Sequence, residues 1–384
     1  APPTLDMGGG AVALGQVEFT VTGSCLFVIL FFTTLVVMLV ILTPAKLEVT
    51  TARRKLALAL YGAAYLVLSR DSQFQLPPDP GRSTAPASGK KRIIFVRHGE
   101  SAWNECFNRS FDLSFPVRLF TTLLREAALM LCLDSALLDS PLSQVGFEQA
   151  KELQRYVEGD QGEELRKLSE TAVFVSSPLR RAAATAVVGF ARYFGAGRPL
   201  WLVSDLQEIS RNVDTLGLAA PWSAPPLQPH EAAVVAAAGR SAAAATGGAA
   251  WCRDAASSCM LASFNFGNKA IEDRGSHRLE SFCDWVFSPC GPATPQPTVI
   301  VAGHSLWFRT FFQAYMPHTA YHECKHAKIV NCGVVMFDLE RLQPSCGGRR
   351  EYRIGVDSVR VLYGGFEKAK AARGAKPAAA SKRD

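Results

Sequence analysis

The chain has 384 residues, a formal net charge of +7 at pH 7 and 48% hydrophobic residues. This length accommodates one large α/β domain with appended segments. The modest positive charge suits an anionic membrane surface or an anionic substrate. No basic stripe is interleaved with aromatic residues, which argues against nucleic acid as a partner.

Ten cysteines are scattered along the chain, without a Cys-x-x-Cys pair or a Cys/His cluster of zinc spacing. We therefore expect no metal site, and we expect no cofactor either. Cys252 with Cys259, and Cys283 with Cys290, can pair in an oxidising compartment, whereas scattered reduced thiols are the more ordinary state.

The first part of the chain is predicted to anchor it to a membrane. Residues 1–24 carry few charges and precede an uncharged run, 25–43. As a helix this run spans about 28 Å, close to one bilayer core. We expect a retained transmembrane helix rather than a cleaved signal peptide, because no basic residue precedes the long run. The positive-inside rule then places the remainder of the chain on the cytosolic side, or an organelle's equivalent side, because basic residues follow the run: Lys46, Arg53, Arg54 and Lys55.

Residues 44–89 are predicted to connect this anchor to the main domain. The apolar run 56–68 is too short to span a bilayer, so we expect a helix buried against the domain or lying on the membrane surface. Residues 71–90 are rich in Pro, Gly and Ser and indicate a polar linker. The main domain is predicted over 90–366, and a solvated basic tail over 367–384.

A buried strand with an abrupt polar end marks the start of the main domain. The apolar residues 93–96 are followed at once by Arg97, His98 and Gly99. Sheets of α/β proteins bind ligands at the carboxyl ends of their strands, and a glycine there lets the backbone approach a bound group. Arg97 and His98 are therefore candidate site residues.

Helices and strands alternate downstream, which predicts the α/β class: a three-layer α/β/α domain with a central, mostly parallel sheet, preceded by a single N-terminal transmembrane helix. We expect helices at 143–157, 180–194 and 306–315, and strands at 172–176, 200–203, 298–301, 330–339 and 358–363.

Two stretches depart from this alternation. Residues 115–133 predict an amphipathic helix with Arg118, Arg125 and Glu126 on one side, interpreted as a lid, a membrane-lying helix or an added core helix. Residues 217–260 are dense in Ala, Pro and Gly and indicate a surface excursion, partly disordered.

Five segments, in this order, resemble those of the histidine phosphatase superfamily, the phosphoglycerate-mutase-like enzymes. Apart from the two departing stretches, the resemblance covers most of the main domain. The segments are Arg97-His98-Gly99-Glu100, Asp139 to Ala150, Ser176-Ser177-Pro178-Leu179-Arg180-Arg181-Ala182, Leu206-Gln207-Glu208 and Val301-Ala302-Gly303-His304-Ser305.

The resemblance implies a pocket for the dianion of a phosphomonoester. Arg97 and Arg181 can each direct two N–H donors onto phosphate oxygens, and His304 adds a third positive or hydrogen-bonding contact. Asn104 matches a family asparagine that touches the phosphate. Arg180 is out of register with the family arginine and is expected to be a solvated or salt-bridged neighbour.

The resemblance also implies the chemistry. His98 is the candidate nucleophile, forming a phosphohistidine intermediate, and Glu208 is the candidate general acid and then general base. Ser305 is expected to cap the helix that follows it. Lys269 and Arg278, where the fold resumes, are expected to contact the non-phosphate end of the substrate.

These features predict a metal-independent phosphomonoester hydrolase anchored to a membrane, acting on a phosphorylated small molecule or a phosphoprotein. Two alternatives stay open. One is phosphoglycerate-mutase-type phosphoryl transfer, for which a membrane anchor is an unusual companion. The other is a non-catalytic subunit of a membrane complex that keeps the phosphatase fold, with which the apolar insert is compatible.

Overall fold

The structure is a computed structural model. It describes residues 49–107, 109, 113–246, 259–344 and 350–368. The run 25–43, where the transmembrane helix is predicted, and most of the basic tail lie outside these residues. Within the described residues, no helix combines the length and the hydropathy that crossing a membrane requires.

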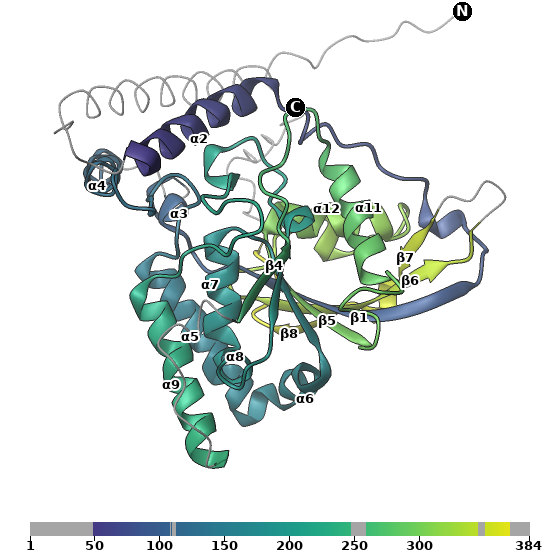
Figure 1. Ribbon diagram of the computed structural model, residues 1–384. Helices are drawn as coiled ribbons and strands as arrows, with labels where there is room; N and C mark the ends of the chain where they lie inside the picture. Colours follow the sequence, from purple (N-terminus) through teal and green to yellow (C-terminus); the bar gives the residue numbers. More distant parts are fainter. Residues whose placement is uncertain (1–48, 108, 110–112, 247–258, 345–349, 369–384) are drawn as a thin grey trace, which may run out of the picture.

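An eight-stranded sheet lies at the centre of the described residues (Figure 1). Its strands follow the order β4-β3-β2-β5-β1-β6-β7, and β8 also pairs with β6. The pairs from β4 to β1 are parallel, whereas β6 runs antiparallel to β1, β7 and β8. The strands are β1 (Ala87–Arg97), β2 (Val173–Ser176), β3 (Leu200–Val203), β4 (Met260–Phe264), β5 (Thr298–Gly303), β6 (Val334–Leu342), β7 (Tyr352–Ile354) and β8 (Arg360–Tyr363).

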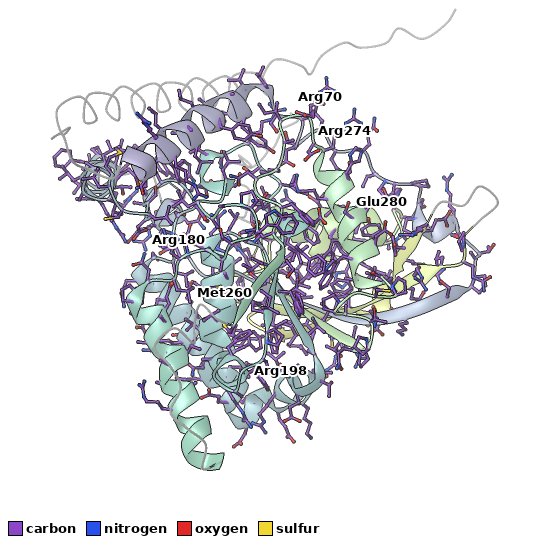
Figure 2. All side chains as sticks on the ribbon, viewed as in Figure 1. Arg70, Arg180, Arg198, Met260, Arg274 and Glu280 are labelled. Carbon is purple, nitrogen blue, oxygen red and sulfur yellow. The ribbon has the colours of Figure 1, made fainter. Side chains whose placement is uncertain are left out.

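Helices cover both faces of the sheet, which confirms the predicted α/β class with helices on either side (Figure 1). Successive residues of a strand point to opposite faces. In β1, Ile94 and Val96 pack with side chains of α5, α7, α8 and α9, while Ile93 and Phe95 pack with those of α11 and α12. Side chains fill the space between the layers (Figure 2). The helices are α2 (Val49–Leu68), α3 (Ala102–Phe107), α4 (Phe115–Ala128), α5 (Gln144–Glu158), α6 (Glu163–Thr171), α7 (Arg180–Gly189), α8 (Ala191–Gly195), α9 (Pro229–Thr246), α11 (Gly275–Val286) and α12 (Ser305–Tyr315).

The helices α2 and α4 pack against each other at one end of the molecule (Figure 1). The buried ammonium group of Lys55, in α2, lies 3.5 Å from Glu126 Oε1 and donates to the carbonyl of Leu129 at 2.7 Å. The helix expected in this insert is present as Phe115–Ala128 and Arg125 is exposed, whereas Glu126 does not lie on the polar side expected for it. Glu126 turns inward toward this partner, and the exposed side chains of α4 include Val117 and Phe120.

The segment 71–90, interpreted from its composition as a linker, packs against the domain. Asp71 is fully buried, and Asp79 Oδ1 accepts the backbone N–H of His318 at 2.9 Å. The first strand already begins at Ala87. Composition did not reveal this docking, because it depends on contacts between residues that are distant in sequence.

Much of the stretch 217–260 is a packed helix rather than a surface excursion. In α9, Val235 is fully buried. A Cβ on Gly195 of α8 would lie 2.6 Å from the backbone nitrogen of Gly239, so the two helices approach at glycine distance. Alanine has the highest helix propensity, and small residues permit such an approach, so low complexity here is compatible with packing. Residues 247–258 lie outside the described residues.

Most of the remaining expected elements are present with shifted ends. The helix expected at 180–194 is interrupted at Phe190, between α7 and α8. The short β7 has no counterpart among the expected strands. Cys283 and Cys290 are both free thiols, so the alternative that pairs them is not formed.

Candidate active site

Two histidines from distant motifs face each other at one edge of the sheet. Because β1 and β5 run parallel with Arg97 opposite Gly303, the next residues, His98 and His304, leave the sheet at the same edge. The N–H of His98 donates to the carbonyl of Gly303 at 3.0 Å. The two imidazole rings lie 5.1 Å apart, centroid to centroid, and both are buried.

The loop that follows β1 is fixed by the start of α5. A Cβ on Gly146 would overlap the carbonyl oxygen of Glu100, and one on Gly99 would lie 2.6 Å from the carbonyl oxygen of Gly146. Ser143 is the N-cap of α5 and accepts the N–H of Gly146 at 3.1 Å, and its hydroxyl donates to Glu100 Oε2 at 2.8 Å. The motif 139–150 therefore holds the loop that carries the first histidine.

The start of α7 brings Arg181 to the same loop. One turn along this helix, Thr185 Oγ1 accepts the N–H of Gly99 at 3.0 Å. The buried guanidinium group of Arg181 donates to the carbonyl of Asp214 at 2.8 Å and lies 3.5 Å from Asp214 Oδ2. Burial raises the pKa of Asp214, and the charge of Arg181 opposes that rise.

The charges of both candidate phosphate-binding arginines lower the pKa of both histidines. Burial, and after it the charges of Arg181 and Arg97, hold the pKa of His98 well below its ordinary value. Burial and then the charge of Arg181 do the same to the pKa of His304, with a smaller effect from Arg97. The four groups predicted from the two halves of the sequence are therefore brought into one electrostatic neighbourhood.

The imidazole of His98 has a defined tautomer. Its Nδ1 lies 2.6 Å from the carbonyl oxygen of Gly99. A carbonyl oxygen only accepts, so Nδ1 carries the proton and donates. Because the lowered pKa keeps the ring neutral, Nε2 retains its lone pair.

His304 is fully buried, and neither of its ring nitrogens has a hydrogen-bond partner among the described residues. Arg97 Nε is likewise buried and unpartnered there. Buried polar groups are rarely left without a partner, so these atoms are suited to a ligand that accepts hydrogen bonds. Among the described residues, no group of three or more His, Cys, Asp or Glu side chains is arranged to hold a metal ion.

Glu208 caps α12, the helix that begins directly after His304. Its Oε1 accepts the N–H groups of Ile209 at 3.0 Å and Trp307 at 2.9 Å, and its Oε2 accepts that of Leu306 at 3.4 Å. The expectation that Ser305 caps this helix is wrong, since Ser305 is its first residue and the Glu208 carboxylate takes the N–H groups. Burial raises the pKa of Glu208, while the N–H of Trp307 and the charge of Arg181 oppose the rise.

Two further residues named from the sequence lie nearby. Asn104 is half-buried in α3, where its N–H donates to Ser101 Oγ at 3.2 Å, and its contact with phosphate stays a prediction. Arg180 is salt-bridged as expected but buried rather than solvated. It lies 2.5 Å from Asp134 and donates to the carbonyl of Pro226 at 3.2 Å (labelled in Figure 2).

Lys269 and Arg278 are not placed as expected. Both are buried, and both form ion pairs with Asp71, at 2.8 Å and 2.6 Å. Side chains that are enclosed and paired in this way do not reach the non-phosphate end of a substrate. Sequence reasoning missed Asp71, because it lies in a stretch whose composition indicates a linker.

Sequence reasoning also gave no role to two buried carboxylates: Asp139, at the start of a quoted segment, and Asp214, six residues after Glu208. Asp139, whose φ is 48°, accepts the N–H groups of Arg180 at 2.8 Å and Leu218 at 2.9 Å. Asp139 therefore joins the start of α7 to Leu218, which follows Glu208 in the sequence. Burial raises the pKa of Asp139 to about 6. Asp214 holds Arg181, as described above. Asp139 stands first in the segment 139–150, whereas no sequence signal marked Asp214.

No protein-family model and no curated protein matches the chain. Several solved structures are similar to it. A mycobacterial glucosyl-3-phosphoglycerate phosphatase is 16% identical, with a TM-score of 0.35, over 69% of this chain and 98% of that one. A mycobacterial hydrolase is 15% identical, with a TM-score of 0.33, over 70% and 98%. A phosphoserine phosphatase from Entamoeba histolytica is 16% identical, with a TM-score of 0.30, over 64% and 89%.

Proposed function

We propose that this protein is a histidine phosphatase that hydrolyses phosphomonoesters through a phosphohistidine on His98. The observation that carries the proposal is the buried pair of His98 and His304, 5.1 Å apart, within the field of Arg97 and Arg181. Two guanidinium groups and an unpartnered imidazole supply donors and positive charge for a dianion. A neutral imidazole beside them supplies the nucleophile.

The first step forms a bond between His98 Nε2 and phosphorus and breaks the bond from phosphorus to the ester oxygen. Arg97, Arg181 and His304 stabilise the charge on the three remaining oxygens. The departing oxygen takes a proton from Glu208. The raised pKa of this buried carboxyl favours the protonated form that the step requires.

The second step returns the site to its starting state. The Glu208 carboxylate takes a proton from a water molecule, whose oxygen attacks phosphorus. The bond to His98 Nε2 breaks, inorganic phosphate leaves, and the imidazole is neutral again. The hydrogen bond from Nδ1 to Gly99 keeps the ring oriented through both steps.

The test is to trap the intermediate. The full chain is mixed with a radiolabelled phosphomonoester and quenched in alkali, in which phosphohistidine survives. We expect an acid-labile label on the protein, absent in His98→Asn, and a turnover at least ~10³-fold lower in that variant. His277→Asn, an exposed histidine of α11, is the matched control and should retain both label and turnover. Undiminished turnover in His98→Asn would refute the nucleophile. Label passed to an added acceptor alcohol rather than to water would favour phosphoryl transfer of the mutase type.

We also propose that the run 25–43 anchors the enzyme to a membrane. Sequence supports this proposal, because the run is uncharged and the basic residues follow it. The helix α2 begins at Val49, so the catalytic domain would lie close to the bilayer. Full-length protein should stay with membranes after carbonate extraction, and a chain that starts at residue 47 should be released. Release of both proteins would contradict the anchor.

A further inference from the structure

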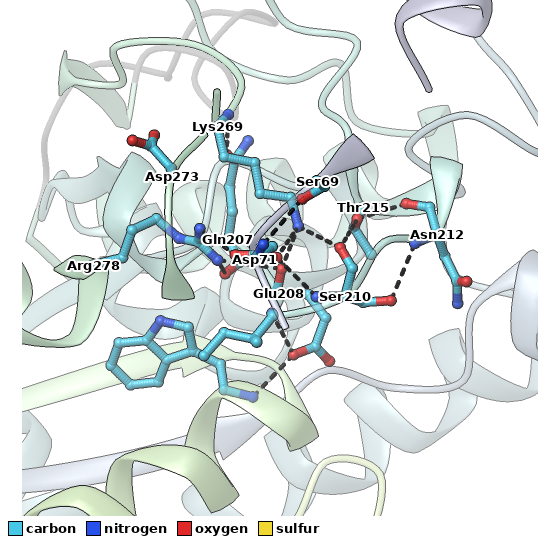
Figure 3. A network of polar contacts seen from close by, with 12 residues as sticks. Ser69, Asp71, Gln207, Glu208, Ser210, Asn212, Thr215, Lys269, Asp273 and Arg278 are labelled. Carbon is cyan, nitrogen blue, oxygen red and sulfur yellow. Dashed lines mark hydrogen bonds and ion pairs between the residues drawn. The ribbon is translucent and has the colours of Figure 1, made fainter. Parts of the chain in front are cut away.

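One buried carboxylate and two buried cations form a cluster against the main chain of residues 207–210, which include Glu208 (Figure 3). Asp71 Oδ2 lies 2.8 Å from Lys269 Nζ, and its Oδ1 lies 2.6 Å from a terminal nitrogen of Arg278. The three residues come from three separate parts of the chain. Asp71 follows α2, Lys269 lies between β4 and α11, and Arg278 lies in α11.

The cations of this cluster hold the main chain of the acid segment. Lys269 Nζ donates to the carbonyls of Glu208 at 2.6 Å and Ser210 at 2.8 Å. Arg278 donates to the carbonyls of Gln207 at 3.3 Å and Glu208 at 3.5 Å. Asp71 completes the arrangement by accepting the N–H of Ser210 at 3.0 Å. All three side chains thus form hydrogen bonds with the main chain of residues 207–210.

The side chain of Glu208, in the same segment, is held by the start of α12. The Glu208 carboxylate accepts the N–H of Trp307, three residues after His304, while its own carbonyl is held by the cluster. The position of the carboxyl relative to the histidine pair therefore depends on both attachments. A rearrangement of the cluster would move the acid without touching the residues expected to bind phosphate.

Asp71 is the member of the cluster on which the other two depend. Without it, two buried cations would face each other with main-chain carbonyls as their remaining partners, an unfavourable arrangement in a buried site. Burial alone would raise the pKa of Asp71, but Lys269 and Arg278 hold that pKa below its ordinary value. Burial lowers the pKa of Lys269 to about 8, and Asp71 opposes a further fall.

We propose that Asp71 is a positioning residue for the acid Glu208, acting through Lys269 and Arg278; this proposal rests on the function proposed above. It assigns a role in the chemistry to a residue outside the predicted 90–366 domain. The helix α2 takes part as well, because Tyr61 donates to the carbonyl of Lys269 at 2.9 Å and the ring of Tyr65 lies 5.0 Å from Lys269 Nζ.

The consequence is a defect that depends on the leaving group. An alkyl phosphate loses an alkoxide that needs a proton from the acid, whereas p-nitrophenyl phosphate loses a stable phenolate that does not. A displaced Glu208 should therefore slow the transfer of phosphate to His98 from the alkyl ester and spare the transfer from the aryl ester. General damage to the fold or to the phosphate pocket would slow both transfers alike.

The experiment uses the full chain and the variant Asp71→Asn in single-turnover kinetics. With glycerol phosphate, we expect formation of the phosphoenzyme to slow by about 10²-fold or more, the size of a general-acid contribution. With p-nitrophenyl phosphate, the burst of nitrophenolate should keep its rate within about threefold, because it needs no general acid. The control is Asp79→Asn, a carboxylate of the same segment that bonds the N–H of His318 instead and should change neither rate.

Asp71→Glu is the second variant, in case Asp71→Asn does not fold as judged by circular dichroism. It keeps the charge and lengthens the side chain, so it should show the same preference for the aryl ester with a smaller loss. Equal losses on the two substrates, or no loss on the alkyl ester, in the folded variant would overturn the proposal. An unaltered chain that forms no phosphoenzyme from either substrate would overturn the proposed function, and the positioning role with it.

Discussion

The carboxylate of Glu367 lies 2.5 Å from the guanidinium group of Arg97. Its place is set by the backbone, since the N–H of Glu367 donates to the carbonyl of Lys328 at 2.7 Å and Phe366 forms a β-bridge with Ile329. The Glu367 carboxylate, near the end of the described residues, thus forms an ion pair with a guanidinium group that is predicted to bind phosphate. A substrate that used this nitrogen of Arg97 would compete with the Glu367 side chain, which is 46% exposed.

Glu367→Ala should therefore strengthen substrate binding. We expect KM for an aryl phosphate, and the inhibition constant of inorganic phosphate, to fall about two- to fivefold, the range of a partly exposed ion pair, with kcat little changed. Glu164→Ala is the matched control, because Glu164 is equally exposed at 48% and pairs with Arg360 on another surface. A KM that is unchanged or higher in Glu367→Ala would contradict the competition.

Adjacent arginines should respond differently to the same substitution. Arg181→Lys loses the two-pronged donor and should lower kcat/KM by about 10²-fold. Arg180→Lys alters the partly buried pair with Asp134 and should lower the melting temperature more than kcat/KM. Kinetics and thermal unfolding of both variants check this prediction. A larger kinetic loss in Arg180→Lys would mean that the register of the motif had been assigned wrongly.

Gly146→Ala should disturb the histidine loop from outside the site. Its Cβ would overlap the carbonyl oxygen of Glu100, so backbone must move, at a cost of about 1–3 kcal/mol in the free energy of unfolding. Activity should fall with it, because the displaced loop carries His98. Chemical denaturation and turnover measure both effects. Gly355→Ala, where a Cβ would find ordinary contacts at 3.7 Å, should change neither.

The histidine pair should make stability depend on pH with a defined sign. A pKa below its ordinary value in the folded protein means that the unfolded chain binds the proton more readily, so stability is lost as pH falls below about 6.5. The many buried carboxylates also titrate, but they are common to the protein and to His304→Gln. We therefore expect the stability of His304→Gln relative to the unaltered protein to rise as pH falls from about 8 to about 5.5, by at most about 1.4 kcal/mol per pH unit. A difference that stays constant with pH would contradict a buried neutral His304.

Local patterns were enough to predict much of the chain. The apolar residues 93–96 predicted β1, and the helix expected from residue 143 starts with Ser143 as its cap. The four groups now found together, from Arg97 to His304, lie at strand ends or at a helix start next to strands. Parallel pairing brings such ends to one edge, which is why short motifs far apart in sequence predicted a common site.

Composition was a poorer guide where it had to distinguish packed from solvated chain. The Ala-rich stretch became α9, and the Pro-rich stretch after Asp71 docked on the domain. In both cases the deciding contacts are made with distant residues, such as Gly195 against Gly239. Such contacts cannot be inferred from a window of neighbouring residues.

The sequence by itself determined the class of fold and the residue types at the candidate site, because hydrophobic periodicity and strand-end motifs are local properties. Only the tertiary structure decided which charges meet: Asp71 with Lys269, Glu208 with the start of α12, and Glu367 with Arg97. The position of a single charged side chain follows no periodic pattern, and its partner depends on which distant residues the fold brings beside it. The partners of these carboxylates became visible only in the folded chain.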